Sequence, residues 1–127
     1  MAGTLVITTL SDGTNSTSAT NPILGSAKAW VNWDGLTGAG NTIRTFYNVS
    51  SITNSGSGVY VINFTNAFPN ADYVVAGMAQ QGGVANGIVM GFATTAPTTS
   101  ALQVNLCNAP GNGSASVTRN TLAVFSS

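Results

Sequence analysis

Residues 59–64 read VYVINF, and this stretch is the strongest single indication of the fold. Apolar and aromatic side chains alternate along it, so that Tyr60, Ile62 and Phe64 share one face of an extended chain. The preceding segment NSGSG, residues 54–58, is rich in turn-forming residues and predicts a hairpin that leads into this strand. We therefore expect a β-strand at residues 59–64 whose Tyr60 face lies in a hydrophobic core.

The same kind of pattern recurs along the rest of the chain. Leu102, Val104 and Leu106 alternate with polar residues and predict another core strand. Within residues 43–52 the alternation weakens, which predicts a bend or bulge near residues 48–50. Further strands are expected at residues 3–9, 27–33, 73–80, 87–92 and 117–125, with a hairpin at residues 81–86 and turns at residues 67–71 and 108–113. About eight short strands at close spacing indicate an all-β protein, either an antiparallel β-sandwich or a jelly-roll-like barrel.

The N-terminal part of the chain departs from this pattern. Residues 11–21 (SDGTNSTSATN) have one alanine as their only apolar side chain, so they cannot contribute to a core. No window combines a helical period with helix caps, so we expect no helix. We predict a single β domain in which residues 1–26 form a strand plus an extended polar arm, and residues 27–127 form a β-knob. Because free termini are usually poorly ordered, a neighbouring subunit is the expected support for the arm.

The chain has few of the side chains that carry out catalysis. It contains no histidine, no glutamate, three Asp, three cations and one cysteine, Cys107. General acid–base catalysis and metal binding draw mainly on His, Glu, Asp and Cys, so we expect no enzyme activity, no cofactor and no metal site. The segment that begins at Asp12 lacks the further carboxylates of a calcium loop and predicts a plain turn. Cys107 is expected to behave as a small buried hydrophobic residue.

Charge and targeting patterns narrow the function classes further. Balanced charges leave no basic patch, which argues against a nucleic-acid partner. No apolar run approaches the roughly 20 residues of a membrane span, and the N-terminus lacks the pattern of a signal peptide. We therefore expect a protein that is made in a cytoplasm and has no membrane partner.

Several features favour self-association. The net charge is zero, and Ser, Thr, Asn and Gly make up close to half of the chain. Residues 73–80 and 87–92 are apolar on both faces of their expected strands, and Trp30 and Trp33 point to opposite faces of one strand. A monomer would leave too much of this apolar surface in water. We expect these surfaces to meet protein in an assembly of several copies of the chain.

The first half of the chain also carries a family resemblance. The segments AKAWVNWDG (27–35), TIRTFYNVSSIT (42–53) and SGVYVINFTNAFPNADY (57–73) resemble, in this order, a family of small virion structural proteins of tailed bacteriophages. The resemblance continues upstream through residues 1–27. Members of this family are described as tail-fibre or minor structural proteins of the particle. The resemblance implies a non-enzymatic protein on the virion surface, assembled in the host bacterial cytoplasm, with the major capsid protein or tail proteins as partners. Because phage fibres, fibre tips and many decoration proteins are homotrimers, it also implies that this chain forms a homotrimer.

The resemblance leaves the position on the particle open. A short knob with a polar arm, without a coiled coil or shaft repeat, favours a capsid decoration (cement) protein. A tail-fibre or receptor-binding tip that contacts a host surface glycan is the alternative. A carbohydrate-binding module unrelated to phages is a third alternative. Its sugar-stacking platform would consist of aromatic residues, although packing in the core and at interfaces is the favoured explanation for them: Trp30, Trp33, Phe46, Tyr47 and Tyr60.

The residues that we expect at interfaces are polar or charged residues of the arm and the charged and aromatic residues of the first knob strands. Lys28, Asp34 and Arg44 are also expected to pair with one another or across a subunit boundary. The full set is Asp12, Asn15, Thr17, Asn21, Lys28, Trp30, Trp33, Asp34 and Arg44.

Overall fold

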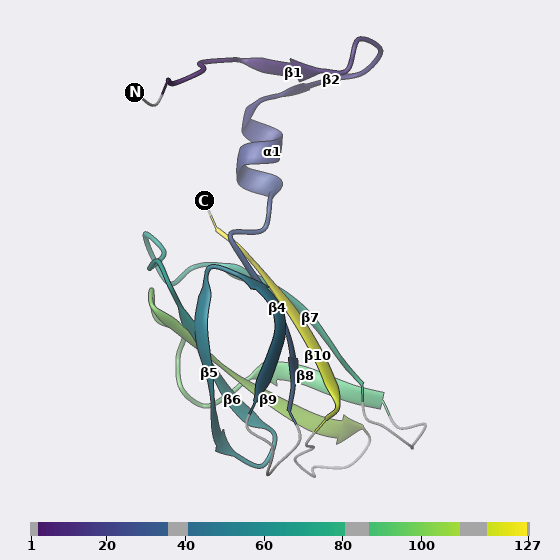
Figure 1. Ribbon diagram of the computed structural model, residues 1–127, viewed down its shortest axis with the longest axis vertical. Helices are drawn as coiled ribbons and strands as arrows, with labels where there is room; N and C mark the ends of the chain where they lie inside the picture. Colours follow the sequence, from purple (N-terminus) through teal and green to yellow (C-terminus); the bar gives the residue numbers. More distant parts are fainter. Residues whose placement is uncertain (1–2, 36–40, 81–86, 110–116, 127) are drawn as a thin grey trace.

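The computed structural model describes residues 3–35, 41–80, 87–109 and 117–126. Within them, ten strands and one helix form a β-sandwich with an N-terminal arm that projects from one end (Figure 1). The elements are β1 (Thr9–Ser11), β2 (Ser16–Ser18), α1 (Thr20–Gly25), β3 (Ala29–Asp34), β4 (Thr42–Tyr47), β5 (Val49–Gly56), β6 (Val59–Phe64), β7 (Val74–Gln80), β8 (Gly87–Phe92), β9 (Ala101–Ala109) and β10 (Arg119–Phe125).

Two four-stranded antiparallel sheets make up the sandwich. The strand order is β4-β3-β10-β7 in the first sheet and β5-β6-β9-β8 in the second. β10 pairs with both β3 and β7, and β9 pairs with both β6 and β8, so the last two strands of the chain lie inside their sheets. The all-β antiparallel prediction is confirmed. The fold is sandwich-like and the barrel is not closed.

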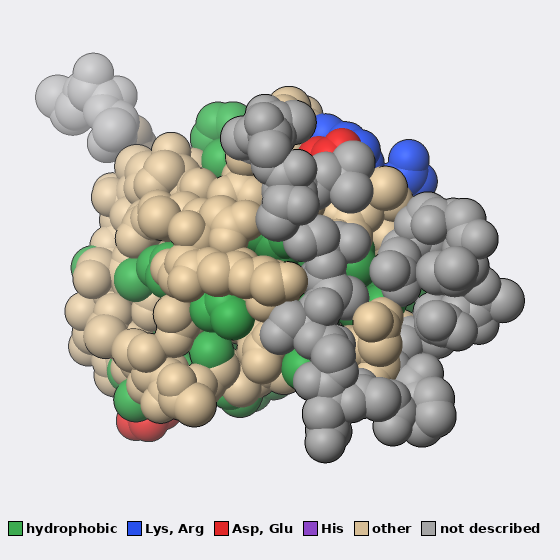
Figure 2. Space-filling view, turned by 90° about the horizontal axis from the view of Figure 1, so that it is seen from below, with side chains coloured by type: hydrophobic (Ala, Val, Ile, Leu, Met, Phe, Trp, Pro, Cys, Tyr) green, Lys and Arg blue, Asp and Glu red, His purple; other side chains and the backbone are tan. Residues whose placement is uncertain are grey.

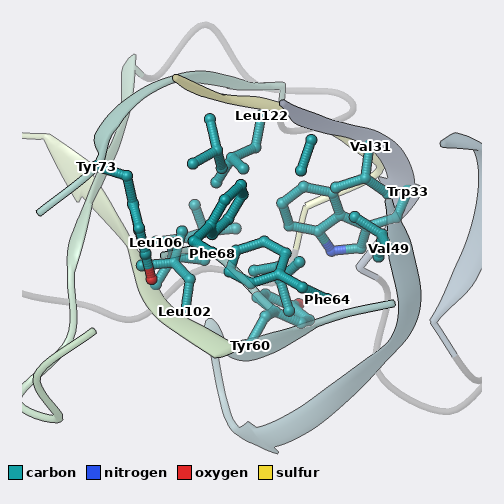
Figure 3. Packing of buried hydrophobic residues seen from close by; sticks show 14 of the residues in the cluster. Val31, Trp33, Val49, Tyr60, Phe64, Phe68, Tyr73, Leu102, Leu106 and Leu122 are labelled. Atoms are coloured by element: carbon teal, nitrogen blue, oxygen red, sulfur yellow. The ribbon is translucent and has the colours of Figure 1, made fainter. Parts of the chain in front are cut away.

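The core lies between the two sheets and follows the predicted alternation. Tyr60 on β6 and Leu102 on β9 are fully buried, as is Trp33 on β3 of the opposite sheet. The rings of Trp33 and Tyr60 meet edge to face with centroids 5.9 Å apart. Phe64 and Phe68 form a second aromatic contact, with centroids 4.6 Å apart (Figure 3). The predicted core faces of β6 and β9 are therefore confirmed.

The predicted bend near residues 48–50 is the point where the chain passes from one sheet to the other. Asn48 lies between β4 and β5 and has a φ of 54°, a left-handed conformation that Asn tolerates better than most residues. Its Nδ2 donates to the carbonyl oxygens of Lys28 and Asn66, both at 3.2 Å, and its Oδ1 accepts from the Asn66 N–H at 2.8 Å. The pairing of β5 with β6 also shifts register between Val49 and Ser51. Asn48 thus lies at the junction of the two sheets and bonds both to Lys28, which precedes it in the chain, and to Asn66, which follows it.

The expected hairpin between residues 73–80 and 87–92 is wrong in its pairing. Both strands exist, but β7 pairs with β10 in the first sheet, and β8 pairs with β9 in the second. Alternation cannot distinguish these pairings, because strands that are apolar on both faces fit either neighbour. The turn at residues 81–86 lies outside the described residues. The turn at 108–113 lies largely outside them too, and β9 extends to Ala109.

The arm is also different from its prediction. The expected strand at residues 3–9 is wrong, because residues 3–8 are not in a strand and β1 begins only at Thr9. Residues 11–21, expected to be extended, contain a hairpin turn, β2 and the start of α1. The helix has Pro22 in its first turn, where proline is favoured, but Ala19 at its N-cap makes no side-chain capping bond. A six-residue helix with no cap leaves too little periodicity to be recognised in the sequence.

Candidate interaction surfaces

The arm, residues 3–25, extends beyond the sandwich along the long axis of the molecule (Figure 1). At its tip β1 and β2 pair in an antiparallel hairpin, with Leu10 opposite Thr17. The Asp12 carboxylate closes the turn, because it accepts hydrogen bonds from the backbone N–H groups of Thr14 at 2.9 Å and Asn15 at 2.7 Å. These bonds, that of Asn15 first, lower the pKa of Asp12 below its ordinary value. Asp12 and Asn15 therefore form the predicted turn.

The arm carries exposed apolar side chains outside the set of residues expected at interfaces. Leu5 is 82% exposed and Val6 is 86% exposed, and Leu10, Ile23 and Leu24 are also exposed. The pattern of residues 3–9 predicts a strand, and nothing in it distinguishes a strand of the sandwich from an exposed segment. Runs of adjacent exposed apolar residues on an arm are typical of surfaces that another protein covers.

Lys28 holds the base of the arm. Its Nζ donates to the carbonyl oxygen of Ile23 in α1 and to Oγ of Ser26 at 2.8 Å. Its backbone N–H donates to the carbonyl oxygen of Val124 in β10 at 2.7 Å. Lys28 thus links the end of the helix to the sandwich. Asn21, another expected interface residue, lies in α1.

The outward side of the first sheet forms an apolar face. Trp30 lies opposite Tyr47 on β4 and opposite Ala123 on β10, and Ala123 in turn lies opposite Ala76 on β7. In the next row Thr121 lies opposite Met78, which is 77% exposed. We define the apolar face as Trp30, Tyr47, Val74, Ala76, Met78 and Ala123. A shallow groove crosses it, lined by Trp30, Asn32, Ala76, Met78, Thr121 and Ala123.

Trp33 lies on the other side of the same strand and is fully buried in the core. It is therefore not available to a partner, although it was among the residues expected at interfaces. Tyr60 is buried as well, and Phe46 is exposed but shares its side of the sheet with Val31, its buried cross-strand partner. The five aromatic residues therefore form no common platform. Only Trp30 and Tyr47 lie together on the outside.

Asp34 and Arg44 form an ion pair within the chain, with 3.0 Å between Oδ2 and Nη2. Nη2 of Arg44 also donates to the carbonyl oxygen of Thr118 at 3.0 Å. The expected pairing of these two charges is confirmed. Seen from the end opposite the arm, blue and red side chains meet at one margin of a mostly uncharged surface (Figure 2).

We searched the described residues for metal-binding clusters and reactive side chains. They contain no group of three or more His, Cys, Asp or Glu side chains that could hold a metal ion. Cys107 is half-buried on β9, opposite Val89, and not fully buried as expected. None of the helices in the described part is long and apolar enough to cross a membrane.

No protein-family model, curated protein or solved structure matches this chain. Its function is therefore inferred from the sequence, the fold and the exposed surfaces.

Proposed function

We propose that this protein is a non-enzymatic structural subunit of a bacteriophage particle, a homotrimeric β-knob on the virion surface that acts as a capsid decoration protein. The observation that carries the proposal is the projecting arm, whose Leu5 and Val6 are almost fully exposed. An arm of this kind buries little apolar surface by itself. It stabilises an assembly when a neighbouring protein covers its apolar side chains. The family resemblance of residues 27–73 supports a structural protein of a phage particle and leaves its position on the particle open.

The composition of the chain suits a passive structural role. A site for general acid–base catalysis needs titratable groups that are close together, and this sequence has only three Asp and no His or Glu. Asp12 bonds to the backbone of its own turn, and Asp34 pairs with Arg44. The remaining carboxylate, Asp72, lies in an exposed turn.

Loss of a decoration protein should lower the heat resistance of the particle, whereas loss of a receptor-binding tip should reduce its adsorption to host cells. We would delete residues 1–25 and assemble particles with the truncated chain. For a decoration protein, the knob should fold but no longer bind capsids, and the particles should be less resistant to heat. Adsorption to host cells should be unchanged. Loss of adsorption from particles of normal heat resistance would contradict decoration.

A receptor-binding tip is the second candidate, and a specific feature favours it. Trp30 and Tyr47 are exposed cross-strand neighbours on the outward side of the first sheet. Two neighbouring exposed aromatic rings are suited to stacking against the ring of a sugar. Under this alternative, Trp30→Ala and Tyr47→Ala should each reduce adsorption while particle heat resistance stays normal.

A further inference from the structure

The chain exposes more surface than a compact monomer of its size. Its accessible surface is 7606 Å² for 12.8 kDa. A compact monomer of that mass is expected to expose about 6,300 Å². The excess of about 1,300 Å² is comparable with the roughly 1,200–2,000 Å² that a specific protein–protein interface buries. The arm and the apolar face both carry exposed apolar side chains that such an interface would cover.

The arm cannot bury its own apolar side chains. Its hairpin has strands of three residues each, and an isolated two-stranded hairpin is marginally stable in water. Leu5 and Val6 precede β1, outside the paired strands, and are exposed. Ala19 is the one buried hydrophobic residue of the described arm. The arm therefore needs an apolar surface from elsewhere.

That surface does not come from the arm's own sandwich in the arrangement seen here. Lys28 fixes the end of α1 to the start of β3, and the helix directs the hairpin away from both sheets (Figure 1). The apolar face lies along the first sheet, with Met78 and Val74 on its edge strand β7. The same apolar face is exposed on a second copy of the chain, so it is available to the arm of the first copy.

We propose that the arm of one copy docks on the apolar face of another copy, with Leu5, Val6 and Leu10 against Trp30 and Met78. Arm and face are different surfaces, so the contact is head to tail, and three such contacts close a ring. This inference rests on the proposed self-assembly and identifies the two surfaces that make it. The groove beside Trp30 is the expected seat of the arm, since it is lined by small or apolar side chains such as Ala76.

Disulfide trapping tests the contact directly. Both chains carry Cys107→Ser, so that the introduced cysteines are the only thiols. One full-length chain carries Leu10→Cys, and a second full-length chain, with an affinity tag, carries Met78→Cys. After the two are mixed and oxidised, we expect a disulfide-linked dimer of one tagged and one untagged chain. The matched control places the acceptor cysteine at Thr53, which is exposed on the second sheet, and the mixed dimer should then be lost.

The other outcomes are equally decisive. Equal trapping at Thr53 would overturn the proposal, as would a disulfide within one chain when Leu10→Cys and Met78→Cys are combined and diluted. A trimer by light scattering without the mixed dimer would overturn the docking but leave the proposed self-assembly intact. A monomer would overturn both.

A second variant tests the face without any cysteine. Met78→Lys places a charge at a side chain that is 77% exposed, so the sandwich should fold, which thermal melting verifies. We expect this variant to lose the trimer mass in light scattering. Val89→Lys, on the outward side of the second sheet, is the control and should keep it. A trimer of the Met78 variant would overturn the proposal.

Discussion

At the residue scale, Gly35 is in close contact with buried side chains of β6 and β10. A Cβ at Gly35 would lie 2.6 Å from Oη of Tyr60 and 2.8 Å from Nδ2 of Asn120. The Gly35 carbonyl oxygen accepts a hydrogen bond from the Tyr60 hydroxyl, and its N–H donates to the carbonyl oxygen of Val117 at 2.9 Å. Only glycine leaves room for both bonds and for the buried Tyr60 ring.

Gly35→Ala should therefore destabilise the fold, because Tyr60 and Asn120 are fully buried and cannot move away. Overpacking of this kind costs about 1–3 kcal/mol in the free energy of unfolding, which urea denaturation measures. Gly25→Ala is the matched control, since nothing lies within 4 Å of its Cβ position. Equal stability of the two variants would contradict the packing described for Gly35.

Phe64 tests the predicted core face of β6. It is 7% exposed and packs against Phe68 and against Tyr73, whose ring centroid is 5.9 Å away. Phe64→Ala should lower the free energy of unfolding by about 3–5 kcal/mol, the usual cost of truncating a buried aromatic residue. Phe46→Ala removes the same atoms from a side chain that is 56% exposed and should cost much less. A cost below roughly 1 kcal/mol for Phe64 would mean that it is not in the core.

At the element scale, the passage from β4 to β5 depends on one asparagine. Asn48 combines a left-handed backbone with three side-chain hydrogen bonds: its Nδ2 donates to the carbonyl oxygens of Lys28 and Asn66, and its Oδ1 accepts from the N–H of Asn66. These bonds fix the end of the first sheet beside the start of the second. In the arm, the Asp12 side chain likewise fixes a turn through hydrogen bonds to the backbone, but this turn is smaller and exposed to water.

Asn48→Ala should destabilise the sandwich for two reasons, the lost hydrogen bonds and a left-handed backbone that alanine disfavours. Lost bonds that leave partly buried partners cost about 1–3 kcal/mol, and the left-handed backbone adds roughly 1–2 kcal/mol. Asn48→Gly loses the same bonds but accepts the backbone, so it should be the more stable variant by chemical denaturation. Alanine and glycine variants of equal stability would contradict the backbone part of this account.

The Asp12 turn should depend on pH. The folded pKa of Asp12 is lowered from its ordinary value of 3.8 by the N–H bonds of Asn15 and Thr14, so the turn is stabilised above that value. This stabilisation is lost as the pH falls through the lowered folded pKa. Amide resonances of Thr14 and Asn15 should shift in that acidic range in an NMR titration. Asp12→Asn keeps an acceptor oxygen but does not titrate there, and its Thr14 resonance should stay constant.

At the scale of the whole molecule, the two sheets differ in what they present to solvent. The outward side of the first sheet carries Trp30, Val74 and Met78, all exposed. The outward side of the second sheet is mixed, because Val61 and the exposed Val89 lie there together with the polar Asn63 and Gln103. The first sheet therefore presents the larger exposed apolar side chains, and the arm projects from one end of the sandwich.

The purified protein should have about three times the chain mass of 12.8 kDa in light scattering. The physical reason is the exposed apolar surface of the arm and of the first sheet, whose contact with water is unfavourable. In addition, the net charge of the chain is zero, so electrostatic repulsion does not keep the copies apart. Raising the salt concentration should not dissociate the assembly, because salt screens charges and not apolar contacts. A monomer at micromolar concentration would contradict the proposed assembly.

The sequence by itself determined the local features of this protein. Alternation in residues 59–64 and 101–106 predicted which side chains face the core, since successive side chains of a strand point to opposite sides. The weak alternation near Asn48 predicted the bend. The scarcity of titratable residues, a fact of composition, is the basis on which we expect a function other than catalysis.

Only the tertiary structure decided which strands are neighbours and which apolar residues remain exposed. β7 and β8 follow one another in the chain yet join different sheets, because pairing depends on distant strands, β10 and β9. Trp30 and Trp33 have the same side chain on one strand, and the packing of the second sheet buries Trp33 alone. The apolar face likewise arises from the pairing of strands that are distant in the sequence, which local periodicity does not encode.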